Sequence, residues 1–586
     1  MRQLLVIVSS LVMSGAAFCT EIHVPADQPS IQAGINAAVD GDTVIISPGR
    51  YVENIDFLGK AITVRSTDPL NTDVVAATII DGNQSGTCVT FRTGEDRDSV
   101  ISGFTITNGG QAVGGGVRCE YSHGAGSSPT ICNNTIAGNT QCGVFIDIAG
   151  YPLVLNNTIS WNDGLNAYGG GLWSYGSAVV VGNIFEGNSA ISGGGAICCI
   201  DPRRLNLIIV NNRCVGNTGR FGSAICVLGY CEDAMIAGNV IDGNGNDDGR
   251  ETVYIDGTRA CVAGNEITHN NDRTVLFCFD STVSISANVI LSNDGAGVFV
   301  GPSPRASVAD MTGNIILWNK GPGVQLSNSP SWVSGNLIAG NQDMAVYCSD
   351  SDCAFINNTV MDNGISMAMG GILLDGGSSW SIHNCLMREN GAAGADQIRL
   401  TYWSQNYIPH VSIDHSNIEG GIDSIDVKPG ATLVWGPGNI DADARFVRPG
   451  RWDDAGTPDD PSDDVYVPGD YRLLPGSPCI DAGTNDVDNP DTPEVETLPA
   501  TDIAGVTRVI DGDFSGTATV DIGAYEFLPG DADGDGRVTL IDLLRIRNSL
   551  GLDPSSSPEA RLADVNGDGA VNMVDLLLAR RQFQGR

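Results

Sequence analysis

The sequence predicts an all-β fold, a right-handed single-stranded parallel β-helix, followed by a small α-helical domain at the C-terminus. A pattern of Asn, any residue, an aliphatic residue, two residues and Asn recurs along the chain, as in Asn134–Asn139 and Asn157–Asn162. Successive copies begin 22 to 29 residues apart, and a period of this size is typical of a solenoid. Glycine turns and short β-type runs separate the copies, whereas a helical repeat would need about 10 to 15 residues of helical periodicity in each unit.

Each unit is therefore interpreted as one coil of three short strands and three turns. Stacked coils would form three parallel sheets, with a rise of about 4.8 Å per coil. Asparagine suits the turns because it tolerates left-handed backbone geometry, and identical amides in neighbouring coils can hydrogen-bond as a ladder. The aliphatic residue is expected to point inward, and its fixed place in every unit argues against a disordered Gly- and Asn-rich linker. The copies begin at Asn134, Asn157, Asn183, Asn212, Asn239, Asn265, Asn288, Asn314, Asn336 and Asn358, and Asn384–Asn390 carries one extra residue.

This repeat pattern resembles that of the pectate-lyase-like right-handed parallel β-helix proteins, over roughly Ile22–Val447. The resemblance is specific for the fold and weak for activity. We assign residues 20–447 to the β-helix.

Residues 1–19 are interpreted as a secretory signal peptide, because Arg2 is followed by the apolar run Leu4–Val12 and then by small residues. Cys19 raises the alternative of a lipoprotein, but Phe18 and Ala16 fit a lipobox poorly. No other segment is long and apolar enough to span a bilayer. We therefore expect a secreted protein, extracellular or at the cell surface, without a transmembrane segment.

The β-helix is predicted to begin with a strand at Ile22–Pro25 and a short helix that follows Ser30. Ser30 can cap this helix, and Ile31, Ile35 and Ala38 share one of its faces. Because an open solenoid end exposes its core and strand edges to water, we expect the helix to cover the N-terminal end. The opening is similar to that of many secreted β-helix proteins, including pectin methylesterases, and this similarity implies a structural cap.

After the coils the composition changes. From Arg448 to Pro468 the chain is rich in Asp and Pro, and the Asn pattern stops. Two later stretches, Tyr471–Gly483 and Val520–Phe527, resemble the closing segment found after β-helices in many secreted bacterial proteins. Residues 448–528 are therefore assigned to a last coil and C-terminal cap, with a separate binding module as the alternative.

Two acidic loops lie near the C-terminus, Asp531–Asp542 and Asp564–Asp575. Ca²⁺ takes about 6–8 oxygen ligands, and loops of this type supply them from positions 1, 3, 5, 7, 9 and 12, with Gly at position 6. Both loops follow this rule with Asp at position 12, and apolar helices are predicted after them, at Leu540–Leu550 and Met573–Phe583. The candidate calcium ligands are Asp531, Asp533, Asp535, Arg537, Thr539 and Asp542 in the first loop and Asp564, Asn566, Asp568, Ala570, Asn572 and Asp575 in the second.

These loops, 33 residues apart and each with only a following helix, resemble a dockerin and not a pair of full EF-hands. The resemblance implies that residues 529–586 take Ca²⁺ as a cofactor and a cohesin-like scaffold domain as a partner. Many dockerins carry Ser or Thr at loop positions 10 and 11 for cohesin recognition, whereas this chain has Leu540–Ile541 and Met573–Val574. The type of partner therefore stays open.

Charge and cysteine content limit the partners further. The formal net charge of the 586 residues is −38, which argues against nucleic acid and anionic membranes as partners. The acidity fits calcium binding or solubility in a salty medium. The 16 cysteines permit disulfides, and Cys226/Cys231 and Cys348/Cys353 could each close one loop. For Cys198 and its equivalents in other coils we favour a stack of small buried residues, and no Cys/His set has zinc spacing.

The coils contain no complete signature of a polysaccharide-cleaving enzyme. The polygalacturonase set is not present, and Ile413–Ser416 only faintly resembles the Asp-His segment of pectate lyases. Lys320, as a base for a lyase, has the simpler interpretation of an exposed turn residue. A hydrolase needs two carboxyl groups about 5–10 Å apart, and Asp350/Asp352 and Asp247/Glu251 are among many candidates. The catalytic residues stay unassigned.

Three functions remain open. Because β-helices with a dockerin most often act on or bind polysaccharide, the resemblance implies a polysaccharide lyase or glycoside hydrolase, or a non-catalytic glycan-binding subunit. The third is an adhesive or structural surface protein. The longest units lie near Trp161, Tyr168, Trp173 and Tyr175, which we expect to wall a groove for a neutral or calcium-bridged glycan.

Overall fold

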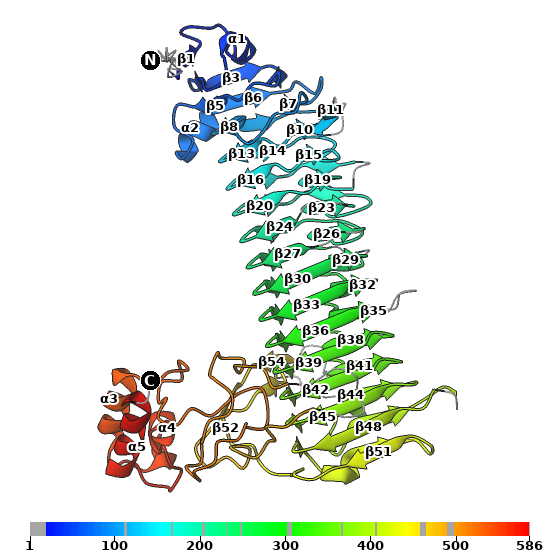
Figure 1. The fold of residues 1–586 in the computed structure, drawn as a ribbon, viewed down its shortest axis with the longest axis vertical. Coiled ribbons are helices and arrows are strands. Elements are labelled where there is room, and N and C mark those ends of the chain that lie inside the picture. The colour runs from blue at the N-terminus through cyan, green and yellow to red at the C-terminus, as the bar shows by residue number, and fades with distance from the viewer. Residues whose placement is uncertain are drawn as a thin grey trace, which may run out of the picture.

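The computed structural model describes residues 19–584, except 111–113, 123, 166–167, 202–205, 230, 232, 246–248, 302–306, 365–366, 405–406, 457–463 and 489–496. These residues form a long stack of coils with a small helical domain beside one end of the stack (Figure 1). Of the predicted signal peptide, only Cys19 lies within the described residues. No helix in this part of the chain is long and apolar enough to cross a membrane.

The coils are built from three long parallel sheets, one strand from each sheet per coil, as predicted. Sheet A has 17 strands: β1 (Glu21–Val24), β2 (Thr43–Ile46), β5 (Thr63–Ser66), β8 (Val100–Ser102), β13 (Thr130–Cys132), β16 (Leu153–Leu155), β20 (Val179–Val181), β24 (Leu207–Val210), β27 (Ala234–Ala237), β30 (Arg259–Ala263), β33 (Thr282–Ser286), β36 (Val308–Thr312), β39 (Ser331–Ser334), β42 (Cys353–Ile356), β45 (Ser379–His383), β48 (His410–Asp414) and β51 (Thr432–Trp435). Sheet B has 15: β3 (Gly49–Val52), β6 (Thr78–Asp81), β9 (Thr105–Thr107), β14 (Thr135–Ala137), β17 (Thr158–Ser160), β21 (Ile184–Glu186), β25 (Arg213–Val215), β28 (Val240–Asp242), β31 (Glu266–Thr268), β34 (Val289–Leu291), β37 (Ile315–Leu317), β40 (Leu337–Ala339), β43 (Thr359–Met361), β46 (Leu386–Arg388) and β49 (Asn417–Ile418). Sheet C also has 15: β4 (Ile55–Asp56), β7 (Val89–Phe91), β10 (Val117–Cys119), β15 (Val144–Ile146), β19 (Leu172–Ser174), β23 (Ile197–Ile200), β26 (Ile225–Leu228), β29 (Glu251–Asp256), β32 (Thr274–Phe279), β35 (Ala296–Gly301), β38 (Val324–Ser327), β41 (Val346–Ser349), β44 (Met369–Asp375), β47 (Asp396–Thr401) and β50 (Ile425–Val427).

Shorter elements decorate the coils and follow them. Four strand pairs lie outside the long sheets: β11 (Tyr121–Ser122) with β12 (Ala125–Gly126), β18 (Asp163–Gly164) with β22 (Ser189–Ala190), β52 (Phe446–Arg448) with β55 (Asp470–Leu473), and β53 (Arg451–Asp453) with β54 (Val465–Val467). The helical segments are α1 (Ile31–Ala37), α2 (Thr72–Ala77), η1 (Gly421–Ser424), α3 (Leu540–Ser549), η2 (Pro554–Ser556), α4 (Pro558–Ala563) and α5 (Met573–Gln584).

Two buried asparagine ladders run along the stack, one on each side of sheet B. In both, the side-chain Nδ2 of each Asn donates to the Oδ1 of the equivalent Asn in the next coil. The first ladder joins the ten asparagines from Asn134 to Asn358 that open the repeat pattern, at 2.9–3.1 Å. The second joins the asparagines that close it, from Asn139 to Asn390, at 2.8–3.1 Å. The predicted inward-facing ladder is confirmed, and a second ladder of the same kind accompanies it.

The last copy of the pattern begins one residue later than predicted. Asn384 is not a ladder residue: it lies in the left-handed region at φ 56°, and its Nδ2 donates to Thr484 O at 3.0 Å. Cys385 takes the ladder place, because Asn358 N donates to its Sγ at 3.5 Å. The step from Cys385 to Asn390 is then five residues, as in every other copy, and no residue is extra.

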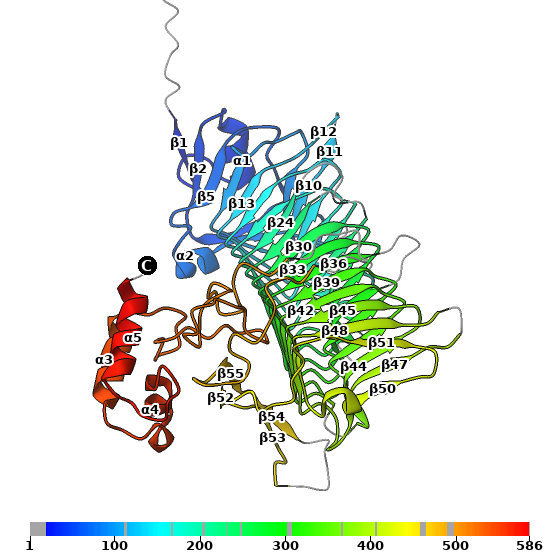
Figure 2. The same cartoon turned by 60° about the horizontal axis from the view of Figure 1, so that its bottom comes forward.

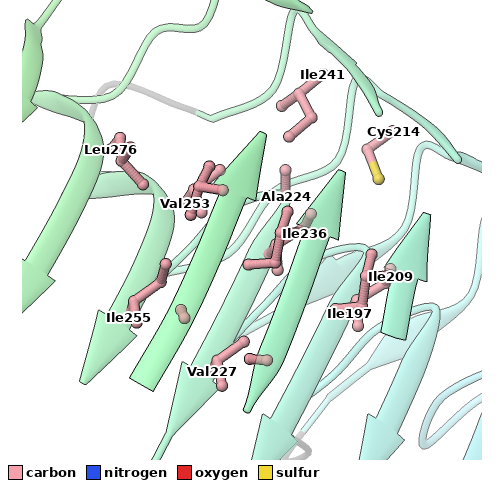
Figure 3. Packing of buried hydrophobic residues seen from close by; sticks show 14 of the residues in the cluster. Ile197, Ile209, Cys214, Ala224, Val227, Ile236, Ile241, Val253, Ile255 and Leu276 are labelled. Carbon is pink, nitrogen blue, oxygen red and sulfur yellow. The ribbon is translucent and has the colours of Figure 1, made fainter. Parts of the chain in front are cut away.

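The aliphatic residue between the two ladders points inward and stacks on its equivalents, as predicted. Ile136, Ile159 and Ile241 are fully buried in one core cluster that runs along the stack. Figure 3 shows Ile241 among other residues of this cluster. Cys199 and Cys214 belong to the same core, and all sixteen cysteines, each within the described residues, are free thiols. The structure therefore contains neither of the two loop-closing disulfides considered above.

The N-terminal end is covered by α1, which lies on the first strands (Figure 1). Ser30 Oγ accepts from Ala33 N at 3.2 Å and caps the helix as predicted. Ile31 and Ile35 are buried, and Gly34 brings the helix so close that a Cβ there would collide with Val44.

The flank segment is our name for the described part of residues 440–528. It folds back along the outer face of sheet B, beside the later coils (Figures 1 and 2). Tyr466 and Tyr471 donate to the buried Asp362 carboxylate at 2.8 and 2.9 Å, and Ala524 N donates to Thr359 Oγ1 at 2.9 Å. The outward-facing apolar side chains of β37, β40 and β43 are thereby covered, which explains why these strands are apolar on both faces.

The C-terminal domain contains both predicted helices, as α3 and α5, and a third helix, α4, that was not predicted. Ser557 caps α4 and Pro558 occupies its first turn. This pair of residues is a local sequence signal for the start of a helix. The domain has its own small core, which Phe514 of the flank segment contacts. Val538 joins Val506, Leu528 and Ile510 in a second cluster, so the domain packs directly on the flank segment.

We expect Asn183→Leu to lower the free energy of unfolding by about 3 kcal/mol, because several buried polar groups lose their partners and each costs about 1–3 kcal/mol. Asn183 Oδ1 accepts from Asn157 N and Nδ2, and its Nδ2 donates to Asn212 Oδ1 and Val154 O. Chemical denaturation measures the loss, with the exposed Asn206→Leu as the control. Equal midpoints for the two variants would show that the ladder contributes nothing.

Candidate functional site

The two acidic loops of the C-terminal domain are built alike. The first carboxylate of each loop accepts from the backbone N–H of the Gly at position 6: Asp531 from Gly536 at 2.9 Å and Asp564 from Gly569 at 3.0 Å. The last carboxylates, Asp542 and Asp575, are buried and accept from the N–H groups of positions 3 and 9. In each loop the first and last predicted ligands thus accept hydrogen bonds from the loop's own backbone.

The chemistry of both loops fits a hard cation. Carboxylate oxygens of Asp531, Asp533 and Asp535 all lie within 4.8 Å of one another. Burial, together with the neighbouring carboxylates, raises the pKa of Asp531 to about 6, so the loop opposes its own ionisation without a cation. The oxygen-only donor set is the one that Ca²⁺ prefers. Arg537 and Ala570, at position 7, would each contribute a backbone carbonyl.

A third loop in the flank segment has the same plan, and it was missed from the sequence. Asp511, Asp513, Ser515 and Gly516 stand at positions 1, 3, 5 and 6, and Gly516 N donates to Asp511 Oδ2 at 3.1 Å. Asp481, from an earlier part of the chain, takes the place of the last carboxylate. It accepts from the N–H groups of positions 3 and 9, at 2.7 and 3.1 Å.

The carboxylates of this third loop converge without a positive partner among them. Oxygens of Asp481, Asp511 and Asp513 lie within 4.8 Å of one another, and the buried Asp511 Oδ1 has no hydrogen-bond partner. The pattern Asp-x-Asp-x-Ser-Gly is the sequence signal for this loop. The pattern is incomplete, because Ile522, and not a carboxylate, stands at position 12.

The outer face of sheet C carries a row of aromatic residues near the N-terminal half of the stack. Phe145 and Trp173 occupy the same register position in β15 and β19, with ring centroids 5.1 Å apart. Tyr175 and Tyr168 lie 5.1 and 5.8 Å from the Trp173 ring. Trp173 is 8% exposed, and its indole Nε1 is buried without an acceptor. Three of the four predicted groove aromatics therefore meet, whereas Trp161 is 67% exposed at the end of β17 and packs on Gly187.

The aromatic row resumes three coils after Trp173. Tyr254, Phe277 and Phe299 share one register position in β29, β32 and β35 and stack at 5.5 and 4.8 Å. Phe221 adds a ring 5.8 Å from Tyr254, and the Arg250 guanidinium lies over Phe221. Between the two aromatic groups the same row holds the paired cysteines of β23 and β26. Together these side chains form what we call the sheet C row: Phe145, Trp173, Cys198, Cys226, Tyr254, Phe277 and Phe299.

A buried pair of carboxyl groups lies beside the second aromatic group. Burial, reinforced by Asp272, raises the pKa of Glu251 to about 7, and burial raises that of Asp272 to about 6. Ser223 and Thr252 donate their hydroxyls to Asp272, while Glu251 Oε2 and Asp272 Oδ1 have no partner. Asp247, the companion suggested for Glu251, lies outside the described residues.

The other sequence candidates have structural roles. Asp350 and Asp352 accept from the backbone of Gly377 and Ser379 and hold one turn. Lys320 is exposed and pairs with Asp294 at 2.7 Å. In the segment Ile413–Ser416, Asp414 meets two histidines: Nδ1 of His383 and of His415 lie 2.7 and 3.2 Å from its Oδ1.

The comparisons with known proteins identify parts of the chain. Residues 529–584 match the family model for the dockerin type I domain, and residues 205–421 match the model described as periplasmic copper-binding protein (NosD). No curated protein matches. In the described part of 205–421, no three His, Cys, Asp or Glu side chains bring ligand atoms within 4.8 Å of one another.

Several solved structures match this chain at low similarity. The catalytic unit of a GH87 α-1,3-glucanase from Streptomyces thermodiastaticus matches with 13% identity over 70% of this chain and 66% of that chain, at a TM-score of 0.30. This chain thus spans slightly less than two thirds of that protein. The mannuronan C-5 epimerase AlgE6 A-module of Azotobacter vinelandii matches with 14% identity over 70% of this chain and 94% of that chain, at a TM-score of 0.26. Pectate lyase Pel9A matches with 12% identity over 88% of this chain and 98% of that chain, at a TM-score of 0.19.

We expect the free energy of unfolding to fall as the pH rises from about 4 to about 7. The folded state holds protons on Glu251 up to a pKa of about 7 and on Asp272 up to about 6, whereas the unfolded chain releases them near its ordinary values. Glu251→Gln should remove part of this slope, so the variant gains stability relative to the parent as the pH rises. Denaturation at several pH values measures it, with the exposed Glu186→Gln as the control. Parallel pH curves for the two variants would contradict the assignment.

Proposed function

We propose that this protein is a secreted, scaffold-attached protein whose β-helix binds and acts on polysaccharide. Its dockerin domain would hold two Ca²⁺ ions and attach the chain to a cohesin-like scaffold domain. The observation that carries the glycan assignment is the sheet C row, in which aromatic side chains follow one another from coil to coil on a rigid face. The match of residues 529–584 to the dockerin type I domain supports the attachment.

The sheet C row suits a sugar polymer that runs along the stack. The rings of Tyr254, Phe277 and Phe299 are partly exposed, so they offer apolar faces on which sugar rings can pack. The net charge of −38 disfavours a strongly anionic glycan unless calcium bridges it.

The dockerin domain presents an apolar recognition surface. Leu540 and Ile541 are 63% and 55% exposed at the start of α3, and Met573 and Val574 are 58% and 47% exposed at the start of α5. These are loop positions 10 and 11 in both halves of the domain. A scaffold domain that binds here would offer an apolar surface of its own.

Two alternatives are separated by the glycan experiment described below. A non-catalytic glycan-binding subunit would retain the glycan without changing it. An adhesive or structural surface protein would bind no glycan and would still dock through residues 529–586. A polysaccharide lyase and a glycoside hydrolase differ in their products, since only the lyase creates an unsaturated uronate.

We expect the full-length protein to bind three Ca²⁺ ions in a calorimetric titration, one in each acidic loop. The double variant Asp531→Ala, Asp564→Ala should lose two of them, because each substitution removes a first-position carboxylate and the hydrogen bonds to its Gly N–H. Asp513→Ala should lose the third only. Glu186→Gln is the control, and full calcium uptake by the double variant would refute the two dockerin sites.

We expect binding of the full-length protein to a neutral polysaccharide to weaken about tenfold, or by about 1.4 kcal/mol, in Trp173→Ala and in Phe277→Ala. Trp161→Ala is the matched control, because Trp161 is exposed but lies at the end of a sheet B strand. Affinity electrophoresis across a glycan panel, with and without Ca²⁺, measures retention. Reducing ends and the absorbance of unsaturated uronates report cleavage. Equal losses in all three variants would place the binding surface elsewhere.

A further inference from the structure

A cleft lies between the later coils and the flank segment. Its volume is about 960 Å³, which is within the range of small-ligand and sugar sites. The coils supply one wall, from the turns that follow β43, β46 and β49. The flank segment supplies the other wall, where Phe446 and Trp452 add aromatic surface.

The coil wall places carboxyl groups at equivalent points of successive coils. Asp362 and Glu389 each follow a sheet B strand, and the pairing of Met361 with Arg388 puts them in register. Both residues have left-handed backbones, at φ 59° and 58°. Neighbouring coils are about 4.8 Å apart, so the backbones of the two residues lie at about that separation.

The carboxyl groups differ in their surroundings. Asp362 is held in place by Tyr466 and Tyr471, and Trp452 Nε1 donates to its carbonyl oxygen at 2.9 Å. Glu389 is exposed and borders the cleft. Glu419 Oε2 accepts from Glu389 N at 2.6 Å, which holds the Glu419 carboxylate against the backbone of Glu389.

Electrostatics acts on the protonation of Glu389. Burial, followed by the charges of Glu419 and Asp362, raises the pKa of Glu389, so this group holds a proton at higher pH than an ordinary glutamate. The charge of Arg388 offsets this rise only in part, and its guanidinium is bonded to Asp441 at 2.7 Å and to Asn417 at 3.1 Å. Glycoside hydrolysis uses two carboxyl groups, one of which keeps its proton until it meets the glycosidic oxygen.

We propose that this cleft hydrolyses glycosidic bonds, with Glu389 as the proton donor and Glu419 as the carboxylate that activates water. This inference rests on the proposed function, because it gives the glycan-directed β-helix a reaction. Glu389 gives its proton to the glycosidic oxygen as the bond between that oxygen and the anomeric carbon breaks. Glu419 takes a proton from water, whose oxygen forms the new bond to the anomeric carbon, and one water is consumed per bond.

The charge of the cleft selects the class of substrate. Two cationic side chains line it, Arg388 and Arg451. The acidic residues that line it are Asp362, Glu389, Asp396, Glu419, Asp423 and Asp443. This excess of negative charge repels uronates and sulfated sugars and admits neutral or amino-sugar glycans. Trp452 and Phe446 then provide surface for the sugar ring.

The test uses the full-length protein on neutral and amino-sugar polysaccharides, with reducing ends as the readout. Glu389→Gln and Glu419→Gln should each lower kcat at least about 100-fold with little change in KM. The loss of Glu389 should also remove the basic limb of the pH profile. Glu186→Gln, on the exposed face of β21, is the control and should leave the rate unchanged.

The outcomes separate this inference from the proposed function. If the protein binds a glycan through the sheet C row but releases no reducing ends from any neutral or amino-sugar polymer, the cleft is not hydrolytic and the binding function stands. If cleavage occurs and both glutamine variants retain it, the catalytic carboxyl groups are elsewhere. If cleavage disappears in both variants while retention is unchanged, the assignment of Glu389 and Glu419 holds.

Discussion

The asparagine ladders are the interaction on which the rest of the structure depends. An amide both donates and accepts, so each ladder Asn satisfies its neighbours in the coil before it and in the coil after it. Asn212, for example, donates to Asn239 and accepts from Asn183. Leu could do neither and Asp could only accept, which explains why asparagine alone fills nearly every ladder position. Because the two ladders are always five residues apart, the strand between them keeps its length and register in every coil.

This constraint also decides where variation occurs. The coils differ in length by several residues, and the extra residues fall in the turns outside sheet B. The sheet C row and the cleft both adjoin those turns. The rigid part of each coil therefore sets the spacing along the stack, and the variable part supplies the side chains that meet a ligand.

The predictable features were the local and periodic ones. The coils, the helix that begins after Ser30 and the acidic loops could be predicted because each has its signal within one unit or a dozen residues. The position of the flank segment could not, since Tyr466 meets Asp362 across 104 residues of sequence and nothing local marks either partner. The third loop was missed for the same reason, as Asp481 lies 30 residues before Asp511. The ladder position predicted for Asn384 was wrong, because its residue type matches the pattern but its backbone geometry does not.

The ladders have a direction, and this bears on how such a chain gains or loses length. The bonds from one asparagine side chain to the next all run toward the C-terminal end. Each ladder stops at a different kind of residue: Asn358 meets the Cys385 sulfur, and Asn390 donates to Gln397 Oε1. The first acceptor, Asn134 Oδ1, is satisfied by the backbone N–H of Phe104. A coil removed or duplicated together with both of its asparagines would leave every remaining amide paired. The interior thus sets no number of coils.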